Sequence, residues 1–256
     1  MERSPPRRPD REDRHKGLAY ALWLPDAMGA ADESERGEPT RGVPAPRWPG
    51  VVVVHGAGSR KENHADFARI ATASGWAAVT FDLTGHGESE GEMSGAAVDD
   101  VIAMVQLLGA HSGVDPRRVI VRGSSLGGFL AICAASVARE IAGVIAICPA
   151  SEDHLAAGVR RGRFEMRVGD PLDLEAWLTA QDVRVAVERI SGRPLILMHA
   201  EGDTQIPSEH SAELYEHAGE PRELVIVPGG AHTTVQHDPE LQATALGWME
   251  RELRGR

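Results

Sequence analysis

The chain has 256 residues, which is enough for one α/β domain with a substantial core and too few for two ordinary domains with linkers. Acidic residues outnumber basic ones, 38 to 27, and the net charge of −11 disfavours nucleic acid and anionic membrane surfaces as partners. Residues 1–17 are rich in Arg, Asp and Pro and hold no apolar stretch. We therefore expect a disordered, cytoplasmic N-terminal extension with neither a secretory signal nor a membrane span.

The first predicted strands flank a polar insert. Residues 18–24 are typical of an early antiparallel strand, and the Pro- and Gly-containing segment 25–49 is predicted to be a mobile surface loop. The run 51–54 is four consecutive valines, which indicates a strand buried on both faces of a parallel sheet. It ends in the small-residue turn 55–58, whose sequence is His-Gly-Ala-Gly.

Helical and strand patterns alternate after this turn. Apolar residues at helical spacing predict helices over 63–74 and 95–108, and residues 77–81 between them read as a strand. Such alternation builds a mostly parallel sheet with helices on both faces. The fold class predicted from the pattern is therefore α/β.

The most informative motif is G-x-S-x-G at residues 123–127, directly after the apolar strand 118–122. A serine in the middle of a sharp strand-to-helix turn takes a strained backbone conformation, so both flanking positions must be small to avoid a Cβ clash. The two glycines flank Ser125 and not Ser124. Ser125 is therefore the candidate nucleophile.

Backbone amides near Ser125 are candidates for an oxyanion hole. Residues 126–132 read as a buried helix, so the amide of Leu126 points back at the serine. The turn at 55–58 ends a neighbouring strand, and its Ala57 amide is the expected second donor.

Two later strands end on an acid and on a histidine. The run 195–200 leads to Asp203, and 224–227 leads to His232. A serine hydroxyl is a weak nucleophile at neutral pH, so His232 would accept its proton while Asp203 held the imidazole in one tautomer. Asp153, after the strand at 144–147, is the alternative acid.

The sequence resembles the α/β-hydrolase family, which uses the same chain order of serine, acid and histidine as Ser125, Asp203 and His232. The resemblance extends from about Leu18 to the last helix. The segments 81–89 and 202–207 also look like that family, and 81–89 resembles the segment that its small esterases and monoglyceride lipases carry beside the site. The resemblance implies one hydrolase domain over residues 18–256, with a short helical cap inserted at about 150–192. It also implies that His86 is a structural loop residue.

The cap segment supplies the candidate substrate-binding residues. Phe164, Met166 and Trp177 are large apolar side chains expected to line a pocket over Ser125. The alternative is that most apolar residues of this segment pack the cap onto the body of the domain. A basic cluster lies in the same segment and is a candidate reader of a substrate carboxylate, although acidic residues nearby could neutralise it. The cluster comprises Arg160, Arg161, Arg163 and Arg167.

No metal site or cofactor is predicted. The sequence contains neither H-E-x-x-H nor paired-Cys spacing, and His210 and His217 are expected to be solvated surface residues. Cys133 and Cys148 read as small core residues without a disulfide.

These residues and the resemblance together predict a serine hydrolase that cleaves a small-molecule carboxylic ester through an acyl-serine intermediate. An acyltransferase or thioesterase would use the same triad, and sequence does not separate water from another acceptor. A non-catalytic ligand receptor with the same fold is the alternative outside the enzymes. The complete Ser-His-Asp set disfavours it, because a receptor needs no base beside a serine. The natural substrate, acyl chain length and oligomeric state stay open.

Overall fold

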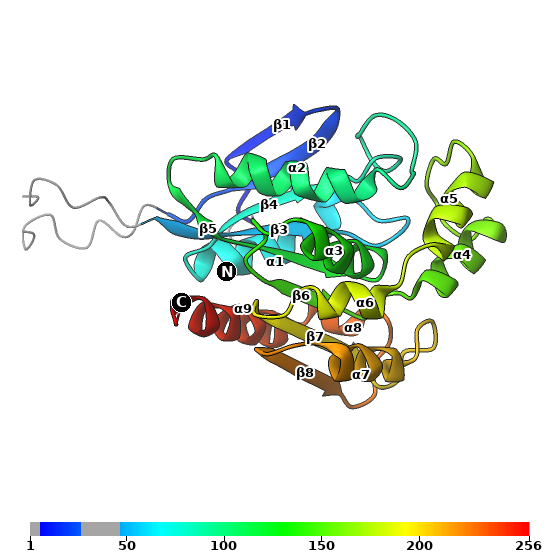
Figure 1. Cartoon of the computed structure of the whole chain (residues 1–256). Helices are drawn as coiled ribbons and strands as arrows, with labels where there is room; N and C mark the ends of the chain where they lie inside the picture. The colour runs from blue at the N-terminus through cyan, green and yellow to red at the C-terminus, as the bar shows by residue number, and fades with distance from the viewer. Residues whose placement is uncertain (1–5, 27–46, 256) are drawn as a thin grey trace, which may run out of the picture.

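The computed structural model describes residues 6–26 and 47–255 of the chain. Within them, eight strands form a single sheet in the order β1-β2-β4-β3-β5-β6-β7-β8 (Figure 1). β1 and β2 pair antiparallel with each other, β2 pairs antiparallel with β4, and the remaining pairs are parallel. The predicted α/β class with a mostly parallel sheet is confirmed. The strands are β1 (Arg11–His15), β2 (Leu18–Trp23), β3 (Trp48–Val54), β4 (Ala77–Phe81), β5 (Val114–Ser124), β6 (Val144–Ile147), β7 (Leu195–Ala200) and β8 (Arg222–Val227).

β1 corrects the prediction that residues 1–17 are disordered. Residues 11–15 pair with β2 along the sheet edge, and the turn between the strands uses Lys16 and Gly17, both with positive φ. Positive φ at both central residues suits the tight turns that join antiparallel strands. β1 is held by backbone hydrogen bonds while its side chains are mostly exposed, so its polar composition gave no sign of order. Residues 1–5 and most of the expected loop at 25–49 lie outside the described residues.

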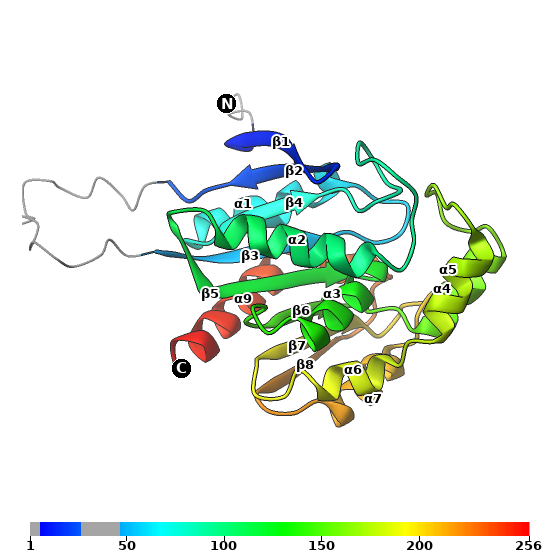
Figure 2. The same cartoon turned by 45° about the horizontal axis from the view of Figure 1, so that its top comes forward.

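Helices cover both faces of the sheet (Figure 2). α2 (Ala97–Gly109), α3 (Leu126–Val137), α6 (Val183–Glu188) and α7 (Ser208–His217) contribute to the core on one face. α1 (Ala65–Ala73), α8 (Thr234–His237) and α9 (Pro239–Arg254) contribute to the core on the other. Alternate valines of β3 enter the two cores, which confirms the expectation of a strand buried on both faces.

The segment between β6 and β7 is helical, and its first two helices lie beyond the carboxyl ends of the strands (Figure 1). It contains α4 (Glu152–Arg160) and α5 (Pro171–Thr179), which pack on each other, and α6, which packs on α3 (Figure 1). Backbone bonds join this segment to the loop after β4, because Arg167 N–H donates to the Gly85 carbonyl and Met93 N–H donates to the Arg167 carbonyl, each at 2.8 Å. Across residues 6–26 and 47–255, no helix has both the length and the apolar character needed to cross a membrane.

Candidate active site

Ser125 occupies a strained turn between β5 and α3. Its φ of 54° and ψ of −119° lie in a region that non-glycine residues rarely adopt, and its backbone is held on both sides. The Ser125 amide donates to the Ile147 carbonyl at 3.0 Å, and its carbonyl accepts from the amides of Phe129 and Ala150 at 3.1 Å. These bonds fix the conformation that presents the side chain at the strand tip.

The flanking glycines are needed for close backbone packing. A Cβ at Gly123 would overlap the carbonyl of Gly127, and a Cβ at Gly127 would overlap the carbonyl of Val54. Ser124 is buried, and its hydroxyl has no partner among the described residues, whereas Ser125 lines a cavity. The geometry therefore agrees with the choice of Ser125 over Ser124 as the candidate nucleophile.

His232 and Asp203 lie together at the carboxyl end of the sheet. The Nδ1 atom of His232 is 2.6 Å from Oδ2 of Asp203, while Oδ1 accepts from the amides of Gln205 at 2.8 Å and Ile206 at 3.1 Å. Burial acts to raise the pKa of Asp203, but these hydrogen bonds outweigh it and lower the pKa below its ordinary value. The carboxylate is thus ionised at neutral pH. Asp153, the alternative acid, is exposed in the first turn of α4 and has no hydrogen bond to His232 in the described part of the chain.

His199 is a second histidine in contact with the Asp203 carboxylate, and the sequence analysis did not single it out. It is completely buried in β7; its Nδ1 lies 2.7 Å from the Ser211 hydroxyl, and its Nε2 lies 3.0 Å from the Ile206 carbonyl. A carbonyl only accepts, so Nε2 carries the proton and Nδ1 accepts from Ser211. The same Nε2–H is 3.3 Å from Oδ2 of Asp203. A histidine inside an otherwise apolar strand was the available signal.

His55 orients one of the two candidate oxyanion amides. Its Nε2 accepts from the Leu83 amide at 3.0 Å, so Nδ1 carries the proton and donates to the Gly56 carbonyl at 2.7 Å. That carbonyl and the Ala57 N–H belong to one planar peptide and point in opposite directions. Burial, and then the nearby His86, lower the pKa of His55 to about 4, so the ring is neutral at physiological pH.

Both predicted donor amides are available. Ala57 lines the cavity beside Ser125, and Leu126 is the first residue of α3. Within the described residues, neither amide donates to a backbone or side-chain acceptor. An amide in the first turn of a helix, such as that of Leu126, and a free loop amide, such as that of Ala57, can each donate a hydrogen bond to a developing oxyanion.

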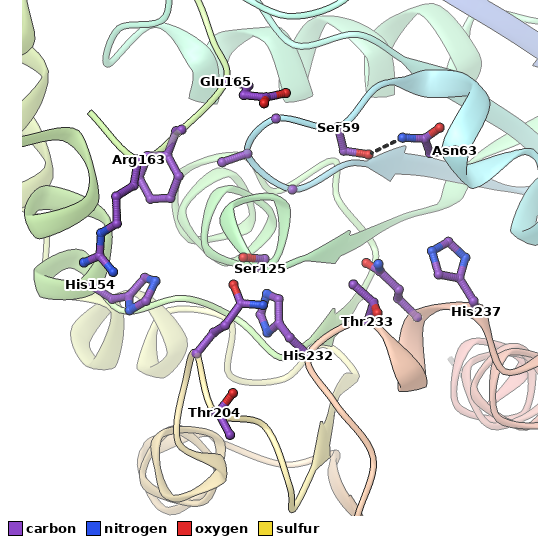
Figure 3. Close-up of a pocket in the computed structure, with 16 residues that line it drawn as sticks. Ser59, Asn63, Ser125, His154, Arg163, Glu165, Thr204, His232, Thr233 and His237 are labelled. Atoms are coloured by element: carbon purple, nitrogen blue, oxygen red, sulfur yellow. Dashed lines mark hydrogen bonds between the residues drawn. The ribbon is translucent and has the colours of Figure 1, made fainter. Parts of the chain in front are cut away.

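A cavity of about 850 Å³ contains Ser125, His232 and Ala57 in its wall (Figure 3). Much of the wall is polar, with contributions from the β3 loop, the cap and α8. These polar residues include Ser59, His154, Arg163, Glu165, Gln236 and His237.

The structure separates the three predicted pocket residues. Phe164 lines the cavity and packs over Gly158, where a Cβ would overlap its ring. Trp177 instead meets Phe129 edge to face, with ring centroids 6.1 Å apart, and covers Gly95. Met166 packs against the core and is absent from the cavity wall. The expectation that Met166 and Trp177 line a pocket over Ser125 is wrong, because their apolar side chains attach the cap to the body.

The basic cluster of the cap is also divided. Arg160 donates to Glu175 at 2.8 Å on the cap surface, and Arg167 donates to the backbone carbonyls of Gly91 and Ser89. Arg163 lines the cavity near His154, where its charge contributes, after burial, to lowering the pKa of that histidine (Figure 3). Arg161 is exposed.

The segment 81–89 is built around Asp82. Its completely buried carboxylate accepts from the amides of Lys61 at 2.7 Å and Glu88 at 2.9 Å, and the Lys61 ammonium lies 3.3 Å away. His86 is buried against His55, with ring centroids 4.8 Å apart, and is not part of the cavity wall. These contacts support the structural role expected for His86.

Both cysteines are free and buried, and His210 differs from expectation. Cys148 lies with Asp203 and His232 in a group whose ligand atoms are within 4.8 Å of one another. Burial raises the pKa of the Cys148 thiol to about 12, and the carboxylate and imidazole already bind each other. His217 is exposed and contacts Glu188, whereas His210, near the start of α7, is half-buried and not fully solvated.

The fold is matched in known proteins. Residues 48–168 match the family model described as serine aminopeptidase, S33. The structure superposes on the α/β hydrolase GrgF from Penicillium sp. sh18 with a TM-score of 0.73 and 18% identity, covering 93% of this chain and 94% of that one. The chain has the α/β-hydrolase fold.

Two further solved hydrolases have the same fold. Est1E from Butyrivibrio proteoclasticus, solved with ferulic acid, gives a TM-score of 0.71 at 18% identity over 96% of this chain and 100% of that one. The monoacylglycerol lipase of Paleococcus ferrophilus gives 0.63 at 20% identity over 82% of this chain and 97% of that one.

Relatives by sequence are longer. The uncharacterised protein YfhR of Escherichia coli O157:H7 is 28% identical over 185 residues, covering 71% of this chain and 62% of that protein. Human protein ABHD12B is 23% identical over 226 residues, covering 80% of this chain and 61% of that protein. The chain thus spans about three fifths of the length of these relatives.

Proposed function

We propose that the protein is a serine hydrolase that cleaves carboxylic esters through an acyl-serine intermediate. The observation that carries the proposal is the joint position of Ser125 and His232 in one cavity wall, with His232 held by a buried, ionised Asp203. A base fixed beside a strained serine is unnecessary for a receptor that only binds a ligand, so catalysis is favoured over the receptor alternative.

The proposed reaction has two halves. Ser125 Oγ attacks the ester carbonyl carbon while Nε2 of His232 takes the hydroxyl proton, and the carbonyl oxygen becomes an oxyanion near the amides of Ala57 and Leu126. The intermediate collapses, the carbon–oxygen bond to the alcohol breaks, and the imidazolium returns its proton to the leaving alkoxide. Water then repeats the sequence on the acyl-serine and releases the acid.

Asp203 acts throughout as an acceptor for the Nδ1 proton. It keeps Nε2 unprotonated and facing Ser125, and it stabilises the imidazolium formed in each half-reaction. In the proposed mechanism the acid itself stays ionised. A thioester or an acyl acceptor other than water would use the same steps, so thioesterase and acyltransferase activities are tested together with hydrolysis.

Ester cleavage is tested with p-nitrophenyl esters of increasing acyl length, with and without an added alcohol acceptor. We expect hydrolysis that is lost in Ser125→Ala and unchanged by EDTA, while Ser124→Ala retains it. Aminoacyl p-nitroanilides run in parallel, because the matching family model is named for an aminopeptidase. Hydrolysis of the anilides without the esters would contradict the proposed substrate class. Equal rates in Ser125→Ala and the wild type would contradict the mechanism.

A further inference from the structure

Arg122 is a completely buried cation three residues before Ser125. Its hydrogen-bond partners are neutral: Nη1 lies 3.2 Å from Nδ1 of His64, and Nη2 donates to the Gln236 carbonyl at 2.9 Å. The guanidinium also lies over the ring of Phe67, 5.0 Å from its centroid. Burial lowers the pKa of Arg122 to about 10, so it stays charged at neutral pH. A buried charge without a bonded carboxylate lowers the stability of the folded state.

The guanidinium determines the tautomer of His64. Arg122 has only donors, so Nδ1 of His64 must accept and Nε2 must carry the ring proton. That Nε2–H faces the Ser59 hydroxyl at 3.4 Å. Burial, and then the charge of Arg122, hold the pKa of His64 well below its usual range, which agrees with a neutral ring.

The Ser59 hydroxyl accepts two hydrogen bonds. One comes from His64, and the other from the Asn63 amide group at 3.1 Å (Figure 3). A serine oxygen has two lone pairs and one proton, so both acceptor positions are used and the proton is left to donate. No acceptor for that proton is found among the described residues, and Ser59 lines the cavity two residues after Ala57.

Arg122 joins this wall of the cavity to the wall that carries His232. Its second bond, to the carbonyl of Gln236, holds α8, and α8 directly follows the His232 loop. On the same helix, His237 stacks on His64 with ring centroids 5.8 Å apart and bonds Asp66 at 2.7 Å. One buried guanidinium therefore contacts both the histidine that bonds Ser59 and the helix that follows His232.

We propose that Ser59 is a specificity-determining residue whose hydroxyl donates a hydrogen bond to an acceptor oxygen on the acyl part of the substrate, with Arg122 as its positioning residue through His64. The acyl part is chosen because Ser59 lies on the loop of the Ala57 amide, which faces the acyl carbonyl, while the leaving alcohol must face His232. This inference rests on the proposed ester hydrolysis. It narrows the substrate class to acyl groups that carry an ether, hydroxyl, carbonyl or carboxylate oxygen near the scissile bond.

The test compares two nearly isosteric pairs of p-nitrophenyl esters: methoxyacetate with butanoate, and 3-methoxypropanoate with pentanoate. Each pair exchanges an ether oxygen for a methylene, and the two pairs place that oxygen at different distances from the carbonyl. Because the ethers differ in intrinsic reactivity, the measured quantity is the ether-to-alkyl ratio of kcat/KM in each variant divided by that ratio in the wild type.

Ser59→Ala should lower this ratio by about threefold to tenfold in at least one pair, as expected for loss of one hydrogen bond. Ser74→Ala, at the exposed end of α1, is the matched control and should leave it unchanged. Arg122→Met should lower the ratio by a similar factor, and Ser59→Ala combined with Arg122→Met should lower it no further.

A merely structural role for Arg122 would lower kcat/KM for ether and alkyl esters alike and would leave the ratio at the wild-type value. That result, or an unchanged ratio in Ser59→Ala for both pairs, would overturn the inference. If Arg122→Met does not fold, Ser59→Ala and its control decide the question alone. A folded wild-type protein without activity on any of the four esters would instead overturn the proposed function, and this inference with it.

Discussion

Asp203 is the residue on which the proposed mechanism depends most sharply, because both of its oxygens are committed to fixed donors. Asp203→Asn should reduce kcat by about 10⁴-fold while the fold is retained, since an amide in this position favours the wrong imidazole tautomer. Asp153→Asn, on the exposed first turn of α4, is the matched control and should change kcat little. Steady-state kinetics on one ester decide the matter, and a larger loss in the Asp153 variant would require another acid.

Arg163 and Arg160 form a natural pair for testing charge recognition in the cavity. Arg163 lines the cavity, while Arg160 is already bound to Glu175. Arg163→Ala should lower kcat/KM on esters of dicarboxylic half-acids by about threefold to tenfold relative to neutral esters, as expected for one solvent-accessible charge contact. Arg160→Ala should leave that preference unchanged. Equal losses on anionic and neutral esters would assign Arg163 a purely structural role.

Individual functional residues can be predicted from the sequence when they belong to a motif. They are missed when only contacts in the folded structure give them their role. Ser125, His232 and Asp203 stand out because each follows an apolar strand in a recognisable turn. His199 and Arg122 sit inside strand runs, where the sequence pattern indicates only burial. Their partners come from segments distant in sequence, such as Gln236 for Arg122, so no local pattern names them.

In the cap segment, the structure differs from the prediction in which apolar side chains line the cavity. Phe164 lines the cavity, whereas Trp177 packs on Phe129 at the interface between cap and body. Phe164→Ala should therefore change the relative kcat/KM of short and long acyl esters, by a factor corresponding to about 1–3 kcal/mol per methylene of fit. Trp177→Ala should leave that preference unchanged and lower the free energy of unfolding by about 2–4 kcal/mol.

Ester series and urea unfolding of the two variants are the measurements. If Trp177→Ala changed the chain-length preference and Phe164→Ala did not, the acyl chain would bind against α5 and not in the cavity lined by Phe164.

The central strands and the helices that cover them were predictable because their apolar residues recur at clear strand or helix spacing. The four valines of β3 predict a buried parallel strand, and the structure places them in both cores. β1 was not predictable from composition, since a polar edge strand is stabilised by backbone bonds that any sequence can make. The assignment of cap side chains failed for a related reason: apolar character indicates burial and does not say against which surface.

For the whole molecule, several buried neutral histidines predict how stability depends on pH. Burial lowers the pKa of His55 to about 4, and burial also lowers the pKa of three further histidines. These are His64, His86 and His199. The unfolded chain binds protons below about pH 6.5, whereas the folded chain does not until lower pH, so stability rises with pH in this window. For His55, a fall from 6.5 to about 4 corresponds to about 3 kcal/mol.

The free energy of unfolding from urea titrations should therefore fall as the pH is lowered from 7 towards 4. Burial raises the pKa of Asp100 and Glu152, which opposes this trend at its acidic end. Stability that is constant or increases on acidification through this range would contradict the neutral, buried state of these rings.

The central claim is that Ser125 is an activated nucleophile, and covalent labelling tests it most directly. A fluorophosphonate or sulfonyl fluoride should inactivate the folded protein with one adduct per chain, and mass spectrometry of the digest should place that adduct on Ser125. His232→Ala should suppress the labelling, because the unassisted hydroxyl is a weak nucleophile. A folded protein that stays unlabelled, or an adduct on Ser124, would contradict the account.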